Sequence, residues 1–388
     1  MKVAFVTHYS KLYGANLALL NTLTGLRDYG VKPIVFVPSE GPLLDRLKDK
    51  GVAYQVVPFR LTMCKRPNLL DVVGRMFRNY YLAKNLAKKF ATNKPDVVYT
   101  NSITTNFGSL FAHFLERPHI WHIREFGDLD YGLRPCFGNS GFQERVRSAS
   151  AVVVVSKAVM AHHFTGPGHG QVDVVYDGVA READLCERMS LANQHKTQNG
   201  HRETFVFSFV GLLQAGKGQH VAINALKQVV DEGGNAELWL IGDGCANYRF
   251  SCESLAGSLG VGDRVKFLGY QRDPNPYYLG SDAGLVCSDF EAYGLTTLES
   301  MSFCRPVIGH ATGGTPELIL DGTTGLLYRE GVKELAKKMS ILLQNRSMSD
   351  EMGRKASRDV FQRFSMESGL NKMSRVINDV YERSQTGC

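Results

Sequence analysis

Short apolar segments alternate with longer helical patterns along this chain, and the alternation occurs twice. The short segments are rich in Val, Ile and Phe, as in Val3-Ala4-Phe5-Val6 and Phe205-Val206-Phe207. Such alternation is typical of βαβ units, whose strands form a buried parallel sheet. The sequence therefore predicts an α/β protein, and its 388 residues exceed what one core accommodates.

The two runs of alternation predict two doubly wound domains. We expect the first at 1–182 and the second at 203–365. Residues 183–202 are expected to be a surface linker, because the stretch from Ser190 to Gly200 is polar and without periodicity. The expected strands are 2–8, 32–38, 53–58, 96–101, 118–124, 151–156 and 172–176 in the first domain and 205–211, 236–242, 264–269, 283–287 and 305–309 in the second.

Composition excludes several other classes of protein. The content of Gly and Pro, 39 and 13 residues, is too low for a collagen-like or low-complexity chain. No apolar run approaches the roughly 18 residues of a membrane span, and the first residues lack the pattern of a signal peptide. The eight cysteines include no CxxC pair and predict reduced thiols rather than a zinc site. We therefore expect a cytoplasmic protein.

The positive charge of the chain is concentrated in one segment. The net charge is only +7, but eight of the basic residues and a single acidic one lie in 60–89. Apolar residues such as Leu70, Phe77 and Tyr81 are interleaved with them. This mixture predicts either a helix on an anionic membrane surface or a core-facing helix with a solvated basic edge. Nucleic acid is not an expected partner, because no nucleic-acid-binding motif is present.

The residues best suited to chemistry follow the expected strand 283–287. Glu291 falls in the turn after this strand, and Gly294 precedes a helix that carries Glu299 in its second turn. The unpaired N–H groups of a helix N-terminus favour phosphate, so we expect a diphosphate at the backbone of Gly294, Leu295 and Thr296. Two carboxylates on either side suit the hydroxyl groups of a nucleotide sugar.

The spacing from Glu291 to Glu299 resembles the E-x7-E motif of the retaining glycosyltransferases of family 4. Other segments of the second domain are similar to the family as well. They are Phe209-Val210-Gly211, Gly216-Lys217-Gly218, Leu240-Ile241-Gly242-Asp243-Gly244, Val265-Lys266-Phe267-Leu268-Gly269, Arg305-Pro306-Val307-Ile308, Gly313-Gly314-Thr315-Pro316-Glu317 and Asp321-Gly322-Thr323-Thr324-Gly325-Leu326-Leu327.

This resemblance implies a GT-B fold, in which two Rossmann-like domains face each other with the active site in the cleft. It implies that Glu291 holds hydroxyls of the donor sugar, that Glu299 holds the ribose, and that Lys217 neutralises the diphosphate. Gly242 is expected in the donor site too. The resemblance also implies that the last helix, 366–388, returns to the first domain.

The first domain resembles the acceptor domain of the family more loosely, through Tyr13-Gly14-Ala15-Asn16, Pro95 to Asn101, Trp121-His122-Ile123-Arg124-Glu125 and Val155 to Val159. The likeness implies that His122 lies beside the reacting sugar at the end of a strand. It also implies that Gly14 lets the backbone approach the phosphates. As alternatives, His122 is a buried core histidine and Gly14 a simple turn glycine.

The chain departs from the family pattern at one position. Leu212 stands where the family usually carries an arginine that shares the diphosphate charge. Lys217 then acts with backbone dipoles alone, or another basic residue such as Arg124 substitutes. The triplet Asp128-Leu129-Asp130 resembles a metal-chelating DxD motif of a different fold, but we expect no metal and no cofactor because Lys217 supplies the cation.

These features predict a retaining glycosyltransferase that moves a hexose-type sugar from a UDP- or GDP-sugar to a glycan or lipid-linked glycan. We expect it to act in cell-surface polysaccharide or glycolipid synthesis, with peripheral contact to the cytoplasmic membrane face through 60–89. A nucleotide-sugar 2-epimerase and a non-catalytic nucleotide-sugar-binding relative are the alternatives. The sequence does not distinguish the base, the sugar or the acceptor.

Overall fold

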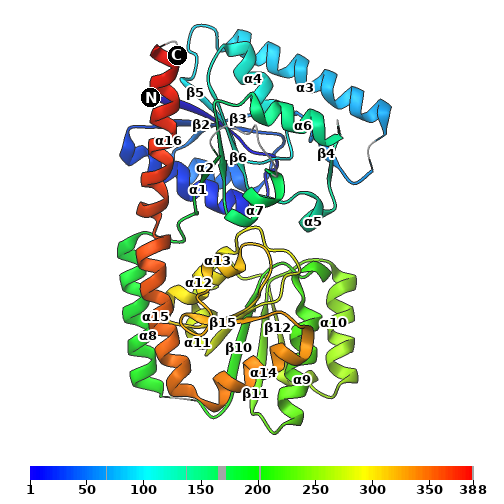
Figure 1. The fold of residues 1–388 in the computed structure, drawn as a ribbon, viewed down its shortest axis with the longest axis vertical. Coiled ribbons are helices and arrows are strands. Elements are labelled where there is room, and N and C mark those ends of the chain that lie inside the picture. Colours follow the sequence, from blue (N-terminus) through cyan, green and yellow to red (C-terminus); the bar gives the residue numbers. More distant parts are fainter. Residues whose placement is uncertain (67, 137, 165–171, 201, 387–388) are drawn as a thin grey trace. The chain divides into compact units, whose positions relative to one another are not determined.

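The protein consists of two compact units in a computed structural model that describes residues 1–66, 68–136, 138–164, 172–200 and 202–386 (Figure 1). The first unit combines Met1–Gly178 with Met366–Cys388, and the second is Val179–Ser365. The chain therefore passes between the units at residues 178/179 and again at 365/366.

The first unit contains a parallel sheet of seven strands in the order β3-β2-β1-β5-β6-β8-β9. The strands are β1 (Lys2–Val6), β2 (Lys32–Val37), β3 (Ala53–Val56), β5 (Val97–Thr100), β6 (His119–Ile123), β8 (Ala151–Val154) and β9 (Val172–Val174). A separate antiparallel ribbon pairs β4 (Met63–Cys64) with β7 (Arg134–Pro135).

Helices pack on both faces of this sheet (Figure 1), which buries the apolar side chains of the central strands. Val3 and Phe5 of β1 point to one core, and Ala4 and Val6 point to the other. Strands covered on both faces are apolar throughout, and this explains the continuous apolar segments of the sequence. The helices are α1 (Gly14–Leu26), α2 (Pro42–Asp49), α3 (Leu69–Lys89), α4 (Phe107–Leu115), α5 (Asp128–Tyr131), α6 (Gly138–Arg147), α7 (Lys157–His163) and α16 (Met366–Thr386).

Helix α16 packs on α1 and β5 of the first unit. Its buried side chains are spaced by four and three residues, so they form one apolar stripe along the helix. Gly25 of α1 leaves room for this contact, because a Cβ atom there would lie 2.1 Å from a methyl group of Leu370. The stripe consists of Met366, Leu370, Met373, Ile377 and Val380.

The second unit contains a parallel sheet of six strands in the order β12-β11-β10-β13-β14-β15. The strands are β10 (Phe205–Val210), β11 (Ala236–Ile241), β12 (Val265–Gly269), β13 (Ala283–Val286), β14 (Val307–His310) and β15 (Gly325–Tyr328). The helices are α8 (Glu182–Asn199), α9 (Gln219–Asp231), α10 (Ala246–Ser258), α11 (Asn275–Gly280), α12 (Leu295–Ser302), α13 (Thr315–Leu318), α14 (Gly331–Gln344) and α15 (Arg346–Phe364).

The two α/β sheets of the prediction are confirmed, but the expected linker is wrong. Residues 182–199 form helix α8, which belongs to the second unit. The helix has weak amphipathic character, and two of its side chains contact residues far along the sequence. Arg188 donates a hydrogen bond of 3.0 Å to Ser302, and Lys196 pairs with Asp350. Tertiary contacts thus stabilise a helix that periodicity did not reveal.

Candidate functional site

The carboxyl ends of β10 and β13 meet at a topological switch point of the second unit. The sheet order corresponds to 3-2-1-4-5-6 in chain order, so β10 and β13 are neighbours whose connections leave in opposite directions. In open α/β sheets, ligands bind in the crevice that this divergence creates. The loop after β10 carries Lys217, and the loop after β13 carries Glu291.

Lys217 lies in a short 3-10 turn, Ala215–Lys217, that is held against the loop after β13. The backbone N–H of Asp289 donates a hydrogen bond of 3.1 Å to the carbonyl of Gly216. Gly218 has φ +80°, and a Cβ atom there would lie 2.3 Å from the carbonyl oxygen of Cys287. This glycine therefore allows the two loops to approach closely.

The carboxylate of Glu291 is fixed by two side chains. The Nζ of Lys217 donates to its Oε2 at 2.8 Å, and the Oγ of Ser288 donates to the same oxygen at 2.9 Å. Behind it, a Cβ atom on Gly313 would lie 2.2 Å from the carbonyl oxygen of Glu291, and the N–H of Gly314 donates to that oxygen at 2.7 Å. The pair of glycines thus packs against the backbone of Glu291.

Helix α12 begins beside this carboxylate. Its N-cap is Gly294 at φ 104°, with no side chain to cap the first turn. A Cβ atom on Gly294 would lie 3.3 Å from Cγ of Glu291, so the glutamate stem lies against the helix N-terminus. Leu295 and Thr296 form the first turn and are partly exposed. Their position provides N–H groups and a helix dipole next to the cation of Lys217.

Glu299 lies further along α12 in a more enclosed setting. Its Oε2 accepts a hydrogen bond of 2.7 Å from the hydroxyl of Tyr278 on α11. Burial raises the pKa of this carboxyl, while the Tyr278 bond and the charge of Arg188 oppose the increase. The carboxyl group is therefore oriented by a buried tyrosine.

Gly242 and its neighbours have a structural role that the sequence did not reveal. A Cβ atom on Gly242 would lie 2.0 Å from the carbonyl oxygen of Gly211, and one on Gly244 would lie 2.3 Å from that of Leu213. The backbones after β10 and β11 therefore run in contact. The side chain of Leu212, in the loop after β10, is 37% exposed. The cation that this loop places beside Glu291 is Lys217.

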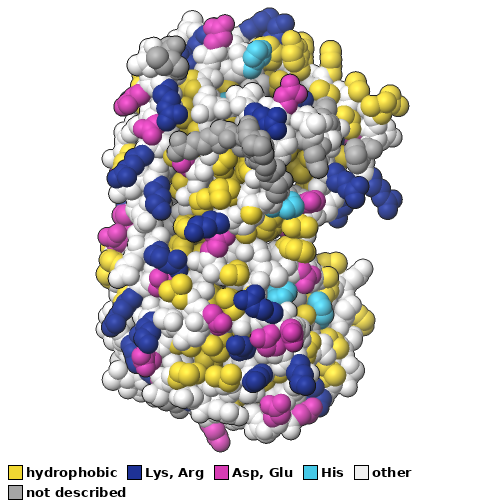
Figure 2. Space-filling model, in the orientation of Figure 1, with side chains coloured by type: hydrophobic (Ala, Val, Ile, Leu, Met, Phe, Trp, Pro, Cys, Tyr) yellow, Lys and Arg dark blue, Asp and Glu magenta, His cyan; other side chains and the backbone are white. Residues whose placement is uncertain are grey.

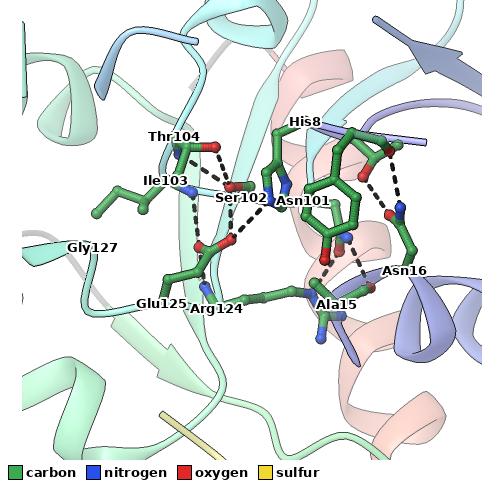
Figure 3. A network of polar contacts seen from close by, with 12 residues as sticks. His8, Ala15, Asn16, Asn101, Ser102, Ile103, Thr104, Arg124, Glu125 and Gly127 are labelled. Atoms are coloured by element: carbon green, nitrogen blue, oxygen red, sulfur yellow. Dashed lines mark hydrogen bonds and ion pairs between the residues drawn. The ribbon is translucent and has the colours of Figure 1, made fainter. Parts of the chain in front are cut away.

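In the first unit, polar side chains converge at the carboxyl ends of β1, β5 and β6 (Figure 3). The Oγ of Ser102 donates to Oε1 of Glu125 at 2.7 Å, and the Nε2 of His8 lies 3.7 Å from the same oxygen. Burial raises the pKa of the Glu125 carboxyl to about 7, and burial together with the charge of Arg124 lowers the pKa of His8 to about 3. His8 is therefore neutral at physiological pH.

Arg124 connects the strands around this cluster. Its Nε donates to Oδ1 of Asn101 at 2.6 Å, and its Nη1 pairs with Asp177. Asn101 in turn donates to the carbonyl of Ala15 in α1, at 3.2 Å. The Nη2 of Arg124 and the Nδ1 of His8 are buried, and no hydrogen-bond partner for them exists among the described residues. Arg124, proposed from sequence as a substitute cation, is thus engaged within its own unit.

His122 lies near the carboxyl end of a strand, as expected, but its side chain is enclosed. It lies inside β6 and is fully buried, whereas Arg124 follows the carboxyl end of the strand. Its Nδ1 is hydrogen-bonded to the hydroxyl of Tyr99, which also contacts Met373 of α16. Burial lowers the pKa of His122 well below its ordinary value. The Nε2 of His122 is buried and has no hydrogen-bond partner among the described residues, and a role of His122 beside the reacting sugar stays a prediction.

Two other sequence features also have local explanations. A Cβ atom on Gly14 would meet nothing within 4 Å, so its expected approach to phosphate remains a prediction. Asp130 accepts hydrogen bonds from the N–H groups of Phe126 and Gly127, and Asp128 accepts one from His162, so the DxD triplet caps α5. Within the described part of the chain, no three His, Cys, Asp or Glu side chains form a metal site.

Sequence reasoning missed the supporting residues of both units. Ser288 and Tyr278 orient the two glutamates, and nothing in their spacing distinguishes them from other polar residues. The sequence does carry a signal for three residues of the first unit. His8 is the last residue of the expected strand 2–8, and Ser102 and Glu125 directly follow the expected strands 96–101 and 118–124. Polar residues at the carboxyl ends of parallel strands point to a ligand site.

Two Rossmann-like units in one chain are the architecture of the GT-B class of protein. Residues 192–359 match the family model of glycosyl transferases group 1, and residues 13–178 match that of the glycosyl transferase 4-like domain. The chain belongs to the GT-B glycosyltransferases of this family-4 type.

Known relatives are similar over part of their length. N-acetyl-alpha-D-glucosaminyl L-malate synthase of Bacillus anthracis is 32% identical over 169 residues, which are 42% of this chain and 43% of the relative. D-inositol 3-phosphate glycosyltransferase of Corynebacterium kroppenstedtii is 29% identical over 259 residues, 62% of this chain and 54% of the relative. The chain thus spans about half the length of these relatives.

Solved structures match the whole fold. HepE of Anabaena, in complex with UDP and glucose, has a TM-score of 0.79 over 97% of this chain and 99% of its own. Its sequence is 22% identical, so the match establishes the GT-B fold.

Proposed function

We propose that the protein is a retaining glycosyltransferase that moves a hexose-type sugar from a UDP- or GDP-sugar to a glycan or lipid-linked glycan. The observation that carries the proposal is the ion pair of Lys217 and Glu291 beside the N-terminus of α12. Relatives named for lipopolysaccharide core and capsular polysaccharide biosynthesis support the acceptor class, and HepE binds UDP-glucose.

The arrangement suits a diphosphate leaving group. Negative charge grows on the diphosphate when the anomeric C–O bond breaks, and a fixed cation and backbone N–H groups stabilise that charge. On donor binding, the ammonium of Lys217 turns from Glu291 to the diphosphate. The carboxylate of Glu291 is then free to accept hydrogen bonds from sugar hydroxyls, while Ser288 keeps it oriented. Glu299 is assigned to the ribose hydroxyls.

We propose same-face attack, in which a leaving phosphate oxygen takes the proton of the acceptor hydroxyl. In retaining glycosidases, a carboxylate nucleophile lies about 5 to 5.5 Å from a second carboxyl group. Here Glu291 is paired with Lys217 and Glu299 is bonded to Tyr278, so both carboxylates have binding roles. Metal independence is part of the proposal, since Lys217 and the α12 dipole supply the positive charge.

Two substitutions test the proposal. Lys217→Ala and Glu291→Ala should each lower sugar transfer by about 100-fold or more, because each removes a group aimed at the reacting donor. Transfer is measured as nucleotide release over a panel of nucleotide sugars with and without acceptor. Retention of the full rate in both variants would refute the assigned site.

A matched control separates loss of the site from loss of an ion pair. Lys227→Ala removes the exposed pair of Lys227 with Asp231 on α9 and should leave the rate unchanged. The anomeric configuration of the product, followed by NMR, distinguishes retention from inversion. Free nucleotide with an epimerised sugar, or binding without turnover, would favour the epimerase or the non-catalytic alternative.

A further inference from the structure

Helix α3 is attached to the first unit by one face only. Val72, Ala83 and Leu86 are buried on this face. Asn79 is buried as well, and its side chain accepts a hydrogen bond of 2.7 Å from the N–H of Arg60 and donates one of 3.0 Å to Asn106. These contacts fix the rotation of the helix, so the direction of its opposite face is determined.

The opposite face carries an apolar stripe, which we define as Leu69, Leu70, Val73, Phe77 and Tyr81. Tyr80 lies at its edge, where its ring packs against Phe114 of α4. The side chains of Leu70 and Phe77 are 83% and 72% exposed. Leu69, Val73, Phe77 and Tyr81 recur every four residues, so the stripe follows one side of the helix for about 18 Å. Figure 2 shows hydrophobic side chains gathered over this part of the first unit.

Basic side chains lie at both ends of the apolar stripe. Lys84 and Lys88 continue the four-residue spacing from Tyr80, and both are exposed. Lys65 and Arg66 are exposed just before the helix begins. The one acidic residue of the helix, Asp71, is paired with Arg75 at 2.7 Å. Among the described residues, no ion pair is formed by Lys65, Arg66, Lys84 or Lys88, so the stripe lies between two clusters of positive charge.

We propose that this face of α3 docks on an anionic lipid membrane, with the apolar stripe in the interfacial layer and the lysines on lipid phosphates. A continuous exposed apolar stripe of this length is unusual on the surface of a soluble protein. The charge pattern selects the partner, because cations at both ends of an amphipathic helix match a negatively charged, flat surface. None of the described helices combines the length and the apolar character that crossing a bilayer requires. Docking would be interfacial.

The proposal is tested by sedimentation of the full chain with vesicles of phosphatidylcholine alone or mixed with phosphatidylglycerol. We expect binding to the mixed vesicles and binding weaker by roughly tenfold or more to the neutral ones. Phe77→Ser with Leu70→Ser should lower binding about tenfold or more. Lys84→Gln with Lys88→Gln should lower it by a similar factor on the mixed vesicles, and added salt should do the same to the wild type.

Matched controls keep the result specific to α3. Phe250→Ser removes an aromatic ring that is 70% exposed on α10, and Lys333→Gln with Lys337→Gln removes two exposed charges on α14. Both should bind as the wild type does. Equal vesicle binding by the wild type and the Phe77 variant would overturn the proposal. So would a stable dimer that the Phe77 variant abolishes, since the stripe would then be a protein interface.

Discussion

At the scale of single residues, the site depends on glycines that let two loops touch. Gly216 and Gly218 flank Lys217, but only Gly218 has a positive φ and a backbone neighbour in the place of a Cβ atom. A regular side chain at 218 would push the loop away from Cys287 and carry Lys217 with it. The position of the Lys217 ammonium, the proposed catalytic cation, is therefore set by the neighbouring glycine.

This difference between the two glycines predicts opposite outcomes for the same substitution. Gly218→Ala should lower the free energy of unfolding of the second unit by about 1–3 kcal/mol or more, because alanine is strained at this φ and overlaps the Cys287 carbonyl. Gly216→Ala meets open space and should be close to neutral. Thermal unfolding of both variants measures the effect, and an equal loss in both would contradict it.

Glu125 predicts a pH dependence of stability. Burial raises its pKa to about 7 from the ordinary 4.5. Between these two pKa values, the Glu125 carboxyl is protonated in the folded chain and ionised in the unfolded chain. The contribution of Glu125 to the free energy of unfolding is therefore fully present below pH 4.5 and is lost as the pH rises to about 7. The Glu125→Gln variant has no carboxyl group to ionise. Between the two pKa values, its free energy of unfolding should therefore rise by roughly 3 kcal/mol relative to that of the wild type.

The comparison between the wild type and Glu125→Gln separates the pH effect of Glu125 from that of the other titratable groups around it. His8, whose pKa burial lowers to about 3, makes stability fall at acid pH, but it is present in both proteins, as are Arg124 and Asp130. Denaturant unfolding of the two proteins from about pH 5 to about pH 8 gives the difference. If the free energies of unfolding of the two proteins changed with pH in parallel, the pKa of the Glu125 carboxyl would not be raised.

At the scale of elements, helix α16 completes the core of the first unit although it lies at the other end of the sequence. Ile377 is fully buried on the apolar face of α16, whereas the adjacent Asn378 is exposed. Ile377→Asp should destabilise the first unit by on the order of 4 kcal/mol, because it buries an unpaired carboxylate. Asn378→Asp adds the same charge on the outer face and should change stability by about 0.5 kcal/mol or less. Calorimetry of both variants checks this, and equal effects would refute the packing.

At the scale of the whole molecule, the two units divide the proposed work, with the donor nucleotide assigned to the second. In excess chelator, UDP or GDP should raise the unfolding temperature of the second unit and leave that of the first unchanged. The stabilisation should reach about 2.7 kcal/mol at a ligand concentration 100 times the Kd. Differential scanning calorimetry measures both transitions. A shift that disappears with chelator would indicate a metal at the diphosphate and contradict the assignment to Lys217.

Local pattern predicted the elements that are apolar on both faces, such as β1 and β10, and placed Glu291 after a buried strand. It failed at α8, because Arg188 and Lys196 are anchored by residues far along the chain. It also failed at β15 (Gly325–Tyr328), which matched a family motif without being recognised as a strand. It did not show that the ring of His122 is fully buried, because that burial depends on Tyr99 and on Met373 of the distant helix α16.

Apolar alternation and chain order are local properties, and from them alone one can predict two parallel sheets, the loops that carry Lys217 and Glu291, and the helix that carries Glu299. Three contacts could not be predicted in this way: the pair of Lys217 with Glu291, the hydrogen bond from Tyr278 to Glu299, and the buried cluster of Glu125 with His8. These contacts join residues from separate strands and helices, and their distances depend on how strands order within a sheet. That order results from packing of the whole unit, which no short stretch of sequence encodes.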